Sequence, residues 1–186
     1  SNKKRVIVKS HNIQHSSPAT CGRTILAVSF AKSQRFDWMV EKSTELGVDH
    51  IAAVQFERTV KQGSNSAMER YRKISIAAAK QCGRLFLPKT TGPAAFTDTL
   101  NELHQIYPGA DLLYGDPEGP PLTETAGPAN RSDRIIAIGP EGGLTDAEIE
   151  TLNTAGGRGV SISPNVLRIE TAAVAFCAIL GAYCLK

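Results

Sequence analysis

Regular alternation of strand-like and helix-like segments is the feature that most limits how this chain can fold. From residue 24 onward, short runs rich in aliphatic and β-branched residues alternate with longer amphipathic runs. Successive strands joined by helices form parallel sheets, and the connecting helices cover both faces of the sheet. The sequence therefore predicts an α/β fold with a mainly parallel sheet and helices on both faces.

The ends of the predicted elements are marked by their residues. Gly47 and Gly83 close the first two helices, because glycine readily takes the left-handed conformation found after a helix C-terminus. Thr145 and Glu148 have the spacing of a capping box and open a later helix. Strands are expected at 24–30, 50–56, 85–88, 110–115, 134–139 and 159–163, and helices at 36–46, 67–82, 96–104, from 145 onward and at about 170–185.

Composition and charge exclude several classes of protein. With 41% hydrophobic and 21% charged residues, the chain is expected to fold around a core rather than to be disordered. Its net charge of +3 is compatible with a basic patch but does not establish nucleic-acid binding. The longest apolar run, 171–185, is shorter than the ~18 residues of a membrane span. No signal peptide is recognised, so a cytoplasmic protein without a membrane partner is predicted.

The cysteines and histidines show none of the spacings typical of metal sites. Cys21, Cys82, Cys177 and Cys184 lie far apart in the sequence. We interpret them as buried or free thiols of a reducing compartment rather than as disulfides. The four histidines have no cysteine or carboxylate at ligand spacing, so no metal is predicted.

A glycine-rich loop, GPEGG at 139–143, follows the predicted strand RIIAI. Three glycines in five residues permit positive φ and let a ligand approach the backbone closely. Ligands of open α/β sheets bind beyond the carboxyl ends of strands, and the helix that follows adds free N–H groups there. A tight turn without a ligand is the alternative. The spacing is not that of a phosphate loop or a GxGxxG fingerprint, which disfavours an ATPase or a dinucleotide enzyme.

A second loop, SISPNVLRIETA at 161–172, leads from a predicted strand into an almost wholly apolar helix. A helix that is apolar on every side must be buried in a core or against a partner subunit. Arg168 and Glu170 are charges beside this helix. They either pair with each other or cap the helix start, or they belong to a functional site.

Together, GPEGGLTDAEI and LRIETA resemble the SPOUT methyltransferases, and specifically the ribosomal RNA small-subunit methyltransferase E family, which methylates uridine N3 in 16S rRNA. The blocks FDWMVEKSTELGVDHIAAVQFERTV and RYRKISIAAAKQCGRLFLP extend the resemblance upstream. Matching motifs run in order from about Ile25 to Leu185. The resemblance implies S-adenosyl-L-methionine as methyl donor, a C-terminal trefoil knot, a homodimer, and 16S rRNA or the small ribosomal subunit as partner.

The resemblance also implies which residues hold the cofactor, largely through their backbone. Two positions depart from the family's usual pattern: Ser163 stands where glycine is common, and Asn165 where arginine is common. The first affects how closely the backbone approaches the cofactor, and the second removes one RNA contact. The implied cofactor residues are Leu113, Gly139, Glu141, Gly142, Gly143, Ile162, Ser163 and Leu167.

Members of this family begin with a PUA-like β-barrel that helps to grip RNA. Here about twenty residues, including the strand-like run RVIVK at 5–9, precede the strand TILAVSF. We interpret residues 1–23 as an incomplete remnant of that domain and residues 24–186 as the SPOUT methyltransferase domain. Weak RNA binding is the expected consequence.

A basic stripe is expected on the helix 67–82. At 100° per residue, Arg70, Lys73, Lys80 and Gln81 fall on one face, and Tyr71, Ile74, Ala78 and Cys82 fall on another. Such a stripe suits phosphates, although a solvated face is the ordinary alternative. The resemblance implies RNA contact for Arg58, Lys73, Gln81 and Arg84.

For Arg58 and Lys42, an ion pair within the protein is the alternative to RNA contact. For Arg58, just after a predicted strand, the alternative is an exposed ion pair with Glu57 or another carboxylate. Lys42 is a weaker candidate for RNA contact, because Glu41 and Glu45 lie within helical reach.

The implied reaction requires donor and acceptor in line and removal of the N3 proton, either by a base or with help from a stabilising cation. Glu141 is the candidate base and Arg168 the candidate electrostatic stabiliser, on their loop positions. Two other functions stay open: a SPOUT-type tRNA methyltransferase, and a catalytically silent RNA-binding module.

Overall fold

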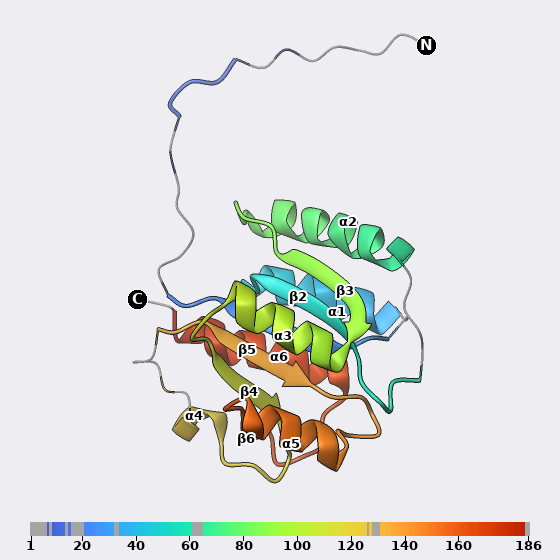
Figure 1. Ribbon diagram of the computed structural model, residues 1–186. Coiled ribbons are helices and arrows are strands. Elements are labelled where there is room, and N and C mark those ends of the chain that lie inside the picture. Colours follow the sequence, from blue (N-terminus) through green and yellow to red (C-terminus); the bar gives the residue numbers. More distant parts are fainter. Residues whose placement is uncertain are drawn as a thin grey trace.

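The centre of the molecule is a six-stranded sheet in which every neighbouring pair of strands is parallel (Figure 1). The computed structural model describes residues 7, 9–13, 15, 21–31, 34–60, 65–125, 127 and 131–184. The strand order is β3-β2-β1-β5-β4-β6. The strands are β1 (Thr24–Ser29), β2 (His50–Gln55), β3 (Lys89–Ala95), β4 (Asp111–Gly115), β5 (Arg134–Ile138) and β6 (Arg158–Val160). The helices are α1 (Gln34–Glu45), α2 (Asn65–Cys82), α3 (Phe96–Ile106), α4 (Leu122–Thr125), α5 (Asp146–Thr154) and α6 (Ile169–Ala182).

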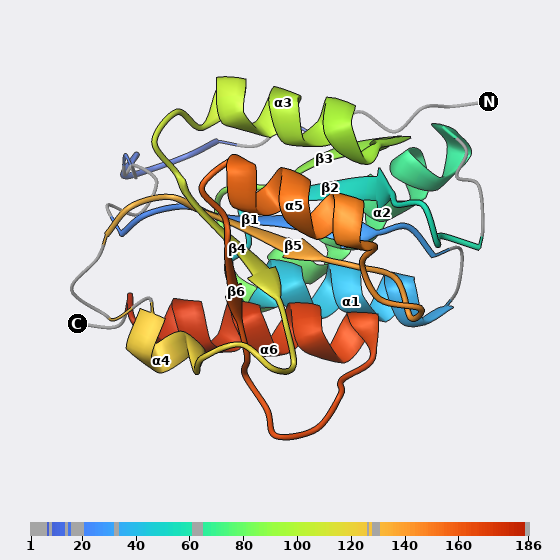
Figure 2. The ribbon, with the colours of Figure 1, turned by 60° about the horizontal axis from the view of Figure 1, so that its bottom comes forward.

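Helices cover both faces of this sheet, as the alternation predicted. Figure 2 shows α3 and α5 on one side and α1 and α6 on the other. Successive side chains of β1 point to opposite faces, so Leu26 and Val28 join one core cluster while Ile25 and Ala27 join the other. The first cluster also takes residues of α2, which packs beside α1. The predicted fold class is confirmed in this respect.

The start of α5 is held by the predicted capping box. The backbone N–H of Glu148 donates to Thr145 Oγ1 (3.3 Å), and the N–H of Thr145 donates to Glu148 Oε2 (2.8 Å). The second carboxylate oxygen, Oε1, accepts the N–H of Glu57 (2.8 Å), which follows β2. One buried carboxylate therefore fixes two loops at the carboxyl edge of the sheet.

One predicted strand is wrong. Residues 85–88 form no strand, and Leu85 and Leu87 are exposed, while β3 lies directly after them. β3 contains a Gly92–Pro93 pair, and because these residues are unfavourable in strands the sequence did not predict it. Gly92 has φ +93°, and a Cβ there would lie 2.2 Å from the carbonyl oxygen of Ala53. Since β3 is an edge strand, Pro93 is tolerated.

Two other segments that were expected to be strands differ from the expectation in smaller ways. The strand expected at 159–163 is shorter, because β6 ends at Val160 and only an isolated bridge joins Ser161 to Pro121. In the run RVIVK, Arg5, Val6 and Val8 lie outside the described residues. Ile7 and Lys9, which are described, belong to no strand.

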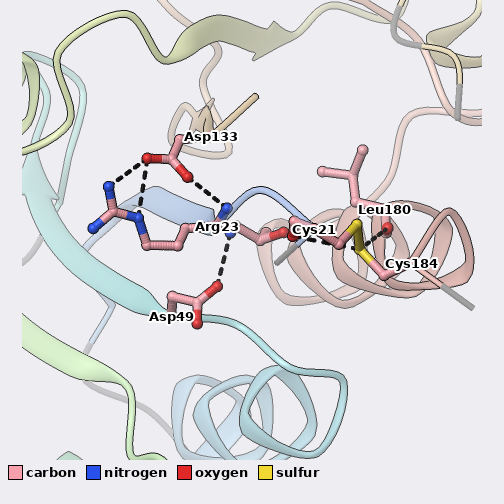
Figure 3. The surroundings of a disulfide bond; sticks show 7 residues. Cys21, Arg23, Asp49, Asp133, Leu180 and Cys184 are labelled. Atoms are coloured by element: carbon pink, nitrogen blue, oxygen red, sulfur yellow. Dashed lines mark hydrogen bonds and ion pairs between the residues drawn. A yellow bond between two sulfur atoms is a disulfide. The ribbon is translucent and has the colours of Figure 1, made fainter. Parts of the chain in front are cut away.

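The interpretation of the cysteines as buried or free thiols is wrong for two of the four. Cys21 and Cys184 form a disulfide, with their Cα atoms 5.6 Å apart (Figure 3). The pairing could not be predicted from a sequence separation of 163, because only the fold brings the end of α6 next to the start of β1. Cys177 is the expected buried thiol, and burial raises its pKa to about 12. Cys82 is a free thiol and is exposed.

Ion pairs and hydrogen bonds surround the disulfide at the edge of the sheet where the strands begin (Figure 3). Arg23 donates its backbone N–H to Asp133 Oδ1 (2.7 Å) and its Nε–H to Oδ2 (3.0 Å). The N–H of Thr24 donates to Asp49 Oδ2 (2.9 Å). The polar groups at this edge therefore hold the starts of β1, β2 and β5 together.

Helix α6 leaves part of its apolar surface uncovered. Ala173, Phe176 and Leu180 are buried in the core, whereas Ala178 and Ala182 are exposed. Complete burial, which the apolar sequence predicted, is not reached within one chain. Among the described segments, no helix combines the length and apolar character needed to cross a membrane.

His50 gives the fold a dependence on pH. Burial, reinforced by the charge of Lys89, lowers its pKa to about 4, and its ring contacts Tyr107 Oη (3.1 Å) and Thr91 Oγ1 (2.8 Å). Between pH 6.5 and about 4 the unfolded chain binds a proton at His50 that the folded chain does not. We expect the free energy of unfolding to fall by up to about 3 kcal/mol as the pH drops through this window.

Urea unfolding at several pH values measures this effect. His50→Gln serves as the comparison, because it keeps a polar side chain but does not titrate. The wild-type protein should lose stability more steeply than the variant below pH 6.5, and equal slopes would contradict the assignment.

Candidate functional site

A cavity of about 400 Å³ opens at the carboxyl ends of β4, β5 and β6, and we call it the first cavity. Its volume falls within the range of small-molecule sites, and its position is the one that open α/β sheets use for ligands. Three loops and the start of α6 enclose it. The lining residues are Gly115–Pro117 after β4, Ile138–Glu141, Gly143 and Leu144 after β5, Val160–Ser163 and Asn165–Arg168 after β6, and Ile169, Ala172 and Phe176 of α6.

Glycine allows the GPEGG loop to fold tightly, because a side chain at Gly139 would collide with a neighbouring residue. A Cβ on Gly139 would lie 2.8 Å from Cγ of Leu144. Gly143 has φ +75°, and its N–H donates to the carbonyl oxygen of Pro140 (2.9 Å). The loop therefore turns back on itself, and Gly139, Glu141 and Gly143 come to line the first cavity.

Arg58 supports this loop from outside. Its Nη1 donates to the carbonyl oxygen of Gly142 (2.8 Å) and lies 3.5 Å from that of Leu144. A Cβ on Gly142 would lie 3.4 Å from Arg58 Cδ, so glycine permits this close approach. The sequence suggested either RNA contact or an ion pair with Glu57 or another carboxylate for Arg58. The structure places its side chain against the GPEGG loop.

The second loop is tied to the segment after β4. The N–H of Ser161 donates to the carbonyl oxygen of Pro120 (2.9 Å), and the N–H of Leu122 donates to the carbonyl oxygen of Ser161 (2.8 Å). Ser163 Oγ accepts the N–H of Asn165 (3.1 Å), so the two residues that depart from the family pattern form a local turn together. This turn keeps Ser163 and Asn165 on the wall of the first cavity.

Arg168 and Glu170 do not pair in the way the sequence suggested. Arg168 occupies the N-cap position of α6, but its side chain makes no capping hydrogen bond and lies exposed on the wall of the first cavity. Glu170 instead pairs with Arg35 of α1, with Nε and Oε1 3.8 Å apart. The side chain of Arg168 is therefore placed for contact with a ligand.

Six of the eight implied cofactor residues line the first cavity. Gly142 lies on the outer side of its loop, and Leu113 is fully buried in the core beneath the cavity. The wall next to β4 is made by Gly115 and Asp116, which the sequence analysis missed although they directly follow the strand ADLLYG. The six are Gly139, Glu141, Gly143, Ile162, Ser163 and Leu167.

The residues implied to contact RNA lie in different settings. Lys73 and Gln81 are exposed on α2. The side chain of Arg84 is only 15% exposed, and burial lowers its pKa from the ordinary value. Its guanidinium donates to the carbonyl oxygens of Thr44 and Gly47, both at 3.1 Å, so it caps the C-terminus of α1.

Two other basic residues are engaged in ion pairs. Arg70 pairs with Asp37. Lys42 lies 2.8 Å from carboxylate oxygens of both Glu41 and Glu45, which are the partners that its helical position suggested.

A second cavity, of about 480 Å³, lies on the other side of the GPEGG loop. It is bounded by the segments that follow β1, β2 and β5 and by the start of α1. Pro140, Glu141 and Ile169 line both cavities. Within the described part of the chain, no group of three or more histidine, cysteine, aspartate or glutamate residues is arranged to hold a metal ion.

Comparison with known proteins agrees with this architecture. Residues 18–181 match the family of RNA methyltransferase domains. The ribosomal RNA small subunit methyltransferase E of Mesomycoplasma hyopneumoniae is 28% identical over 156 residues, which are 82% of this chain and 66% of that protein. The chain spans between about half and two thirds of the length of the curated relatives it matches.

Two solved structures have a similar fold. A putative methyltransferase from Legionella pneumophila, in complex with S-adenosylmethionine, has a TM-score of 0.76 at 28% identity, over 88% of this chain and 67% of the other. The ribosomal RNA small subunit methyltransferase E of Neisseria gonorrhoeae, also bound to S-adenosylmethionine, has a TM-score of 0.75 at 27% identity, over 87% and 66%. With the family match over residues 18–181, the chain belongs to the RNA methyltransferase domain family.

Proposed function

We propose that this chain is the catalytic domain of an S-adenosyl-L-methionine-dependent methyltransferase that methylates N3 of a uridine in 16S rRNA of the small ribosomal subunit. The observation that carries the proposal is the first cavity, where the GPEGG and LRIETA segments meet at the carboxyl ends of β4, β5 and β6. The names of the relatives and the bound cofactor of two similar structures support it.

The first cavity suits this cofactor in shape and in chemistry. Its walls are mainly apolar or glycine, which fits the flat faces of an adenine ring. Close approach to the backbone is possible at Gly115, where a Cβ would have no atom nearer than 3.8 Å, and along the GPEGG loop. Asp116 and Glu141 provide carboxylates at the wall for hydroxyl and amino groups.

The cofactor supplies a methyl group on a positively charged sulfur. The protein must hold the acceptor nitrogen in line with this group and accept the proton that N3 loses. Glu141 is proposed as the proton acceptor, because its exposed side chain stands where the two cavities meet. Arg168, exposed on the opposite loop of the first cavity, is proposed to stabilise the negative charge that develops on the uracil ring.

We also propose that RNA contacts extend beyond the cavities. Lys73 and Gln81 are exposed on α2 and available to phosphates. Arg58 supports the GPEGG loop through Nη1 and places its positive charge on the wall of the second cavity. Arg84 would act indirectly, because its guanidinium group already caps the end of α1. The compartment proposed for this reaction is the cytoplasm.

Three further features belong to the same proposal. Residues 1–23 are proposed to belong to a PUA-like domain and residues 24–186 to form the SPOUT domain. The partly uncovered apolar face of α6 supports a homodimer. The family resemblance supports a trefoil knot near the C-terminus.

Calorimetry and methyl-transfer assays test the function. Titration with S-adenosylmethionine should give saturable heat, and small subunits that lack the modification should gain one N3-methyluridine, measured by mass spectrometry. Absence of binding would favour the silent RNA-binding module. Methylation of transfer RNA in place of 16S rRNA would overturn the proposed substrate.

Gly139→Ala should weaken cofactor binding about tenfold. The added Cβ would displace Leu144, which lines the first cavity, and overpacking of this kind costs about 1–3 kcal/mol. The dissociation constant is measured by calorimetry, with Gly127→Ala as the control because a Cβ there meets no atom within 4 Å. Equal affinities for the two variants would contradict the proposed cofactor position.

A further inference from the structure

We infer that the second cavity is the subsite for the target nucleotide, which it receives flipped out of the RNA, with Arg35 as a contact to the adjoining phosphate. This inference rests on the proposed function and adds to it a place for the acceptor and a residue that positions it. The second cavity is the space between the ends of β1 and β5, the start of α1 and the outer side of the GPEGG loop.

The position of this cavity in the sheet is the first argument. From β1 the chain continues through β2 and β3 toward one edge, whereas β5, β4 and β6 lie on the other side of β1. The boundary between β1 and β5 is therefore the point where the strand order reverses. Ligands of open α/β sheets bind at such a point, outside the carboxyl ends of the strands. The second cavity is lined there by Ser29–Ala31 after β1 and Pro140–Gly142 after β5.

The shared wall is the second argument. Pro140, Glu141 and Ile169 face both cavities, so occupants of the two would be separated only by these residues. Methyl transfer needs the acceptor nitrogen close to the donor methyl group, and a base inside an RNA stack cannot reach an enclosed donor. A cavity of about 480 Å³ is large enough for one extruded nucleotide.

Positive charges at the second cavity favour a ligand that carries a phosphate. The side chain of Arg35 is 58% exposed at the rim of this cavity, and its Nε lies 3.8 Å from Glu170 Oε1. This pair is loose and leaves the guanidinium able to bind a phosphate. Arg58 adds a second positive charge on the wall while its Nη1 holds the carbonyl oxygen of Gly142. Two guanidinium groups beside an apolar floor suit a nucleotide, with its phosphate outside and its base inside.

The floor supplies groups suited to a base. Phe30 is almost fully buried and gives an apolar surface. Beside it, Ser29 Oγ and Thr59 Oγ1 lie 3.1 Å apart, and Thr59 Oγ1 also accepts the N–H of Phe56 (2.9 Å). Thr59 is only partly buried, so its hydroxyl is a fixed polar group at the wall of the second cavity.

The inference is tested with two variants of the full chain. Arg35→Ala should raise KM for RNA at least about tenfold while kcat and the affinity for S-adenosylmethionine stay within twofold, and Arg35→Lys should recover part of the loss. Ala31→Phe, which fills the second cavity, should abolish methyl transfer while cofactor binding remains. Arg131→Ala is the matched control, because this exposed arginine precedes β5 at the opposite edge of the sheet.

Uridine monophosphate provides a direct probe of the same site. Added to protein saturated with S-adenosylhomocysteine, it should shift the amide NMR signals of residues 29–31 and 58–60, and Ala31→Phe should remove these shifts. If the wild-type enzyme methylates RNA but Arg35→Ala behaves like Arg131→Ala and the shifts appear elsewhere, the nucleotide subsite is wrong and the proposed function stands. If S-adenosylmethionine does not bind the wild-type protein, the function itself fails.

Discussion

Replacing Glu141 with glutamine is expected to lower kcat for RNA methylation about a hundredfold while the affinity for S-adenosylmethionine changes by less than about twofold. Glutamine keeps the size and polarity of the side chain but cannot accept the N3 proton. The loss should shrink as the pH rises, because an increasing fraction of the uracil rings then ionises without help. Single-turnover methylation rates measured across a pH series, together with calorimetry, separate the two effects.

Two comparisons keep this prediction specific. Arg168→Ala should lower kcat about tenfold, without the recovery at high pH, since it removes charge stabilisation and not the base. Glu150→Gln, an exposed change on α5 away from both cavities, should have no effect. A Glu141→Gln enzyme with wild-type turnover would remove Glu141 from the mechanism and leave the cofactor site intact.

Loss of the Cys21–Cys184 disulfide is expected to lower the free energy of unfolding by as much as about 5 kcal/mol. The bridge spans 163 positions of the chain, and in the chain-entropy treatment a longer closed loop restricts the unfolded state more strongly. Urea unfolding of Cys21→Ser, and of the wild-type protein with a reductant, measures the effect.

The exposed thiol of Cys82 supplies the control for this experiment. Cys82→Ser should unfold at the wild-type urea concentration and should still respond to reductant, whereas Cys21→Ser should not respond. An unfolding midpoint that is the same for oxidised and reduced wild-type protein would show that the bridge does not contribute to stability.

Patterns confined to one segment were readable from the sequence. The hydrophobic runs of β1, β2, β4 and β5 gave the parallel sheet, and Thr145 with Glu148 gave the start of α5, because neighbouring residues determine each of these features. β3 was missed since its stability comes from pairing with β2, while its own Gly92–Pro93 pair disfavours a strand. The apolar run 85–88, of which residues 85–87 are exposed, was predicted as a strand in its place.

The same division applies to the candidate site. The GPEGG loop was found because glycines at a strand end have a local meaning, and the structure brings this loop and LRIETA to one cavity. The roles of Arg58 and Arg84 depend on partners that are distant in sequence, Gly142 and Thr44. Leu113 is buried in β4, and Gly115, two residues further along the strand, reaches the wall of the first cavity.

The Cys21–Cys184 bridge also makes residues 21–184 a covalent ring. Thermal motion cannot pass one part of a closed ring through another, so the threading present when the two sulfur atoms join is permanent until a bond is broken. Denaturant would expand the oxidised ring without changing that threading, and refolding would begin from a chain whose topology is already determined. A reduced chain has free ends, so its path can rearrange each time it unfolds.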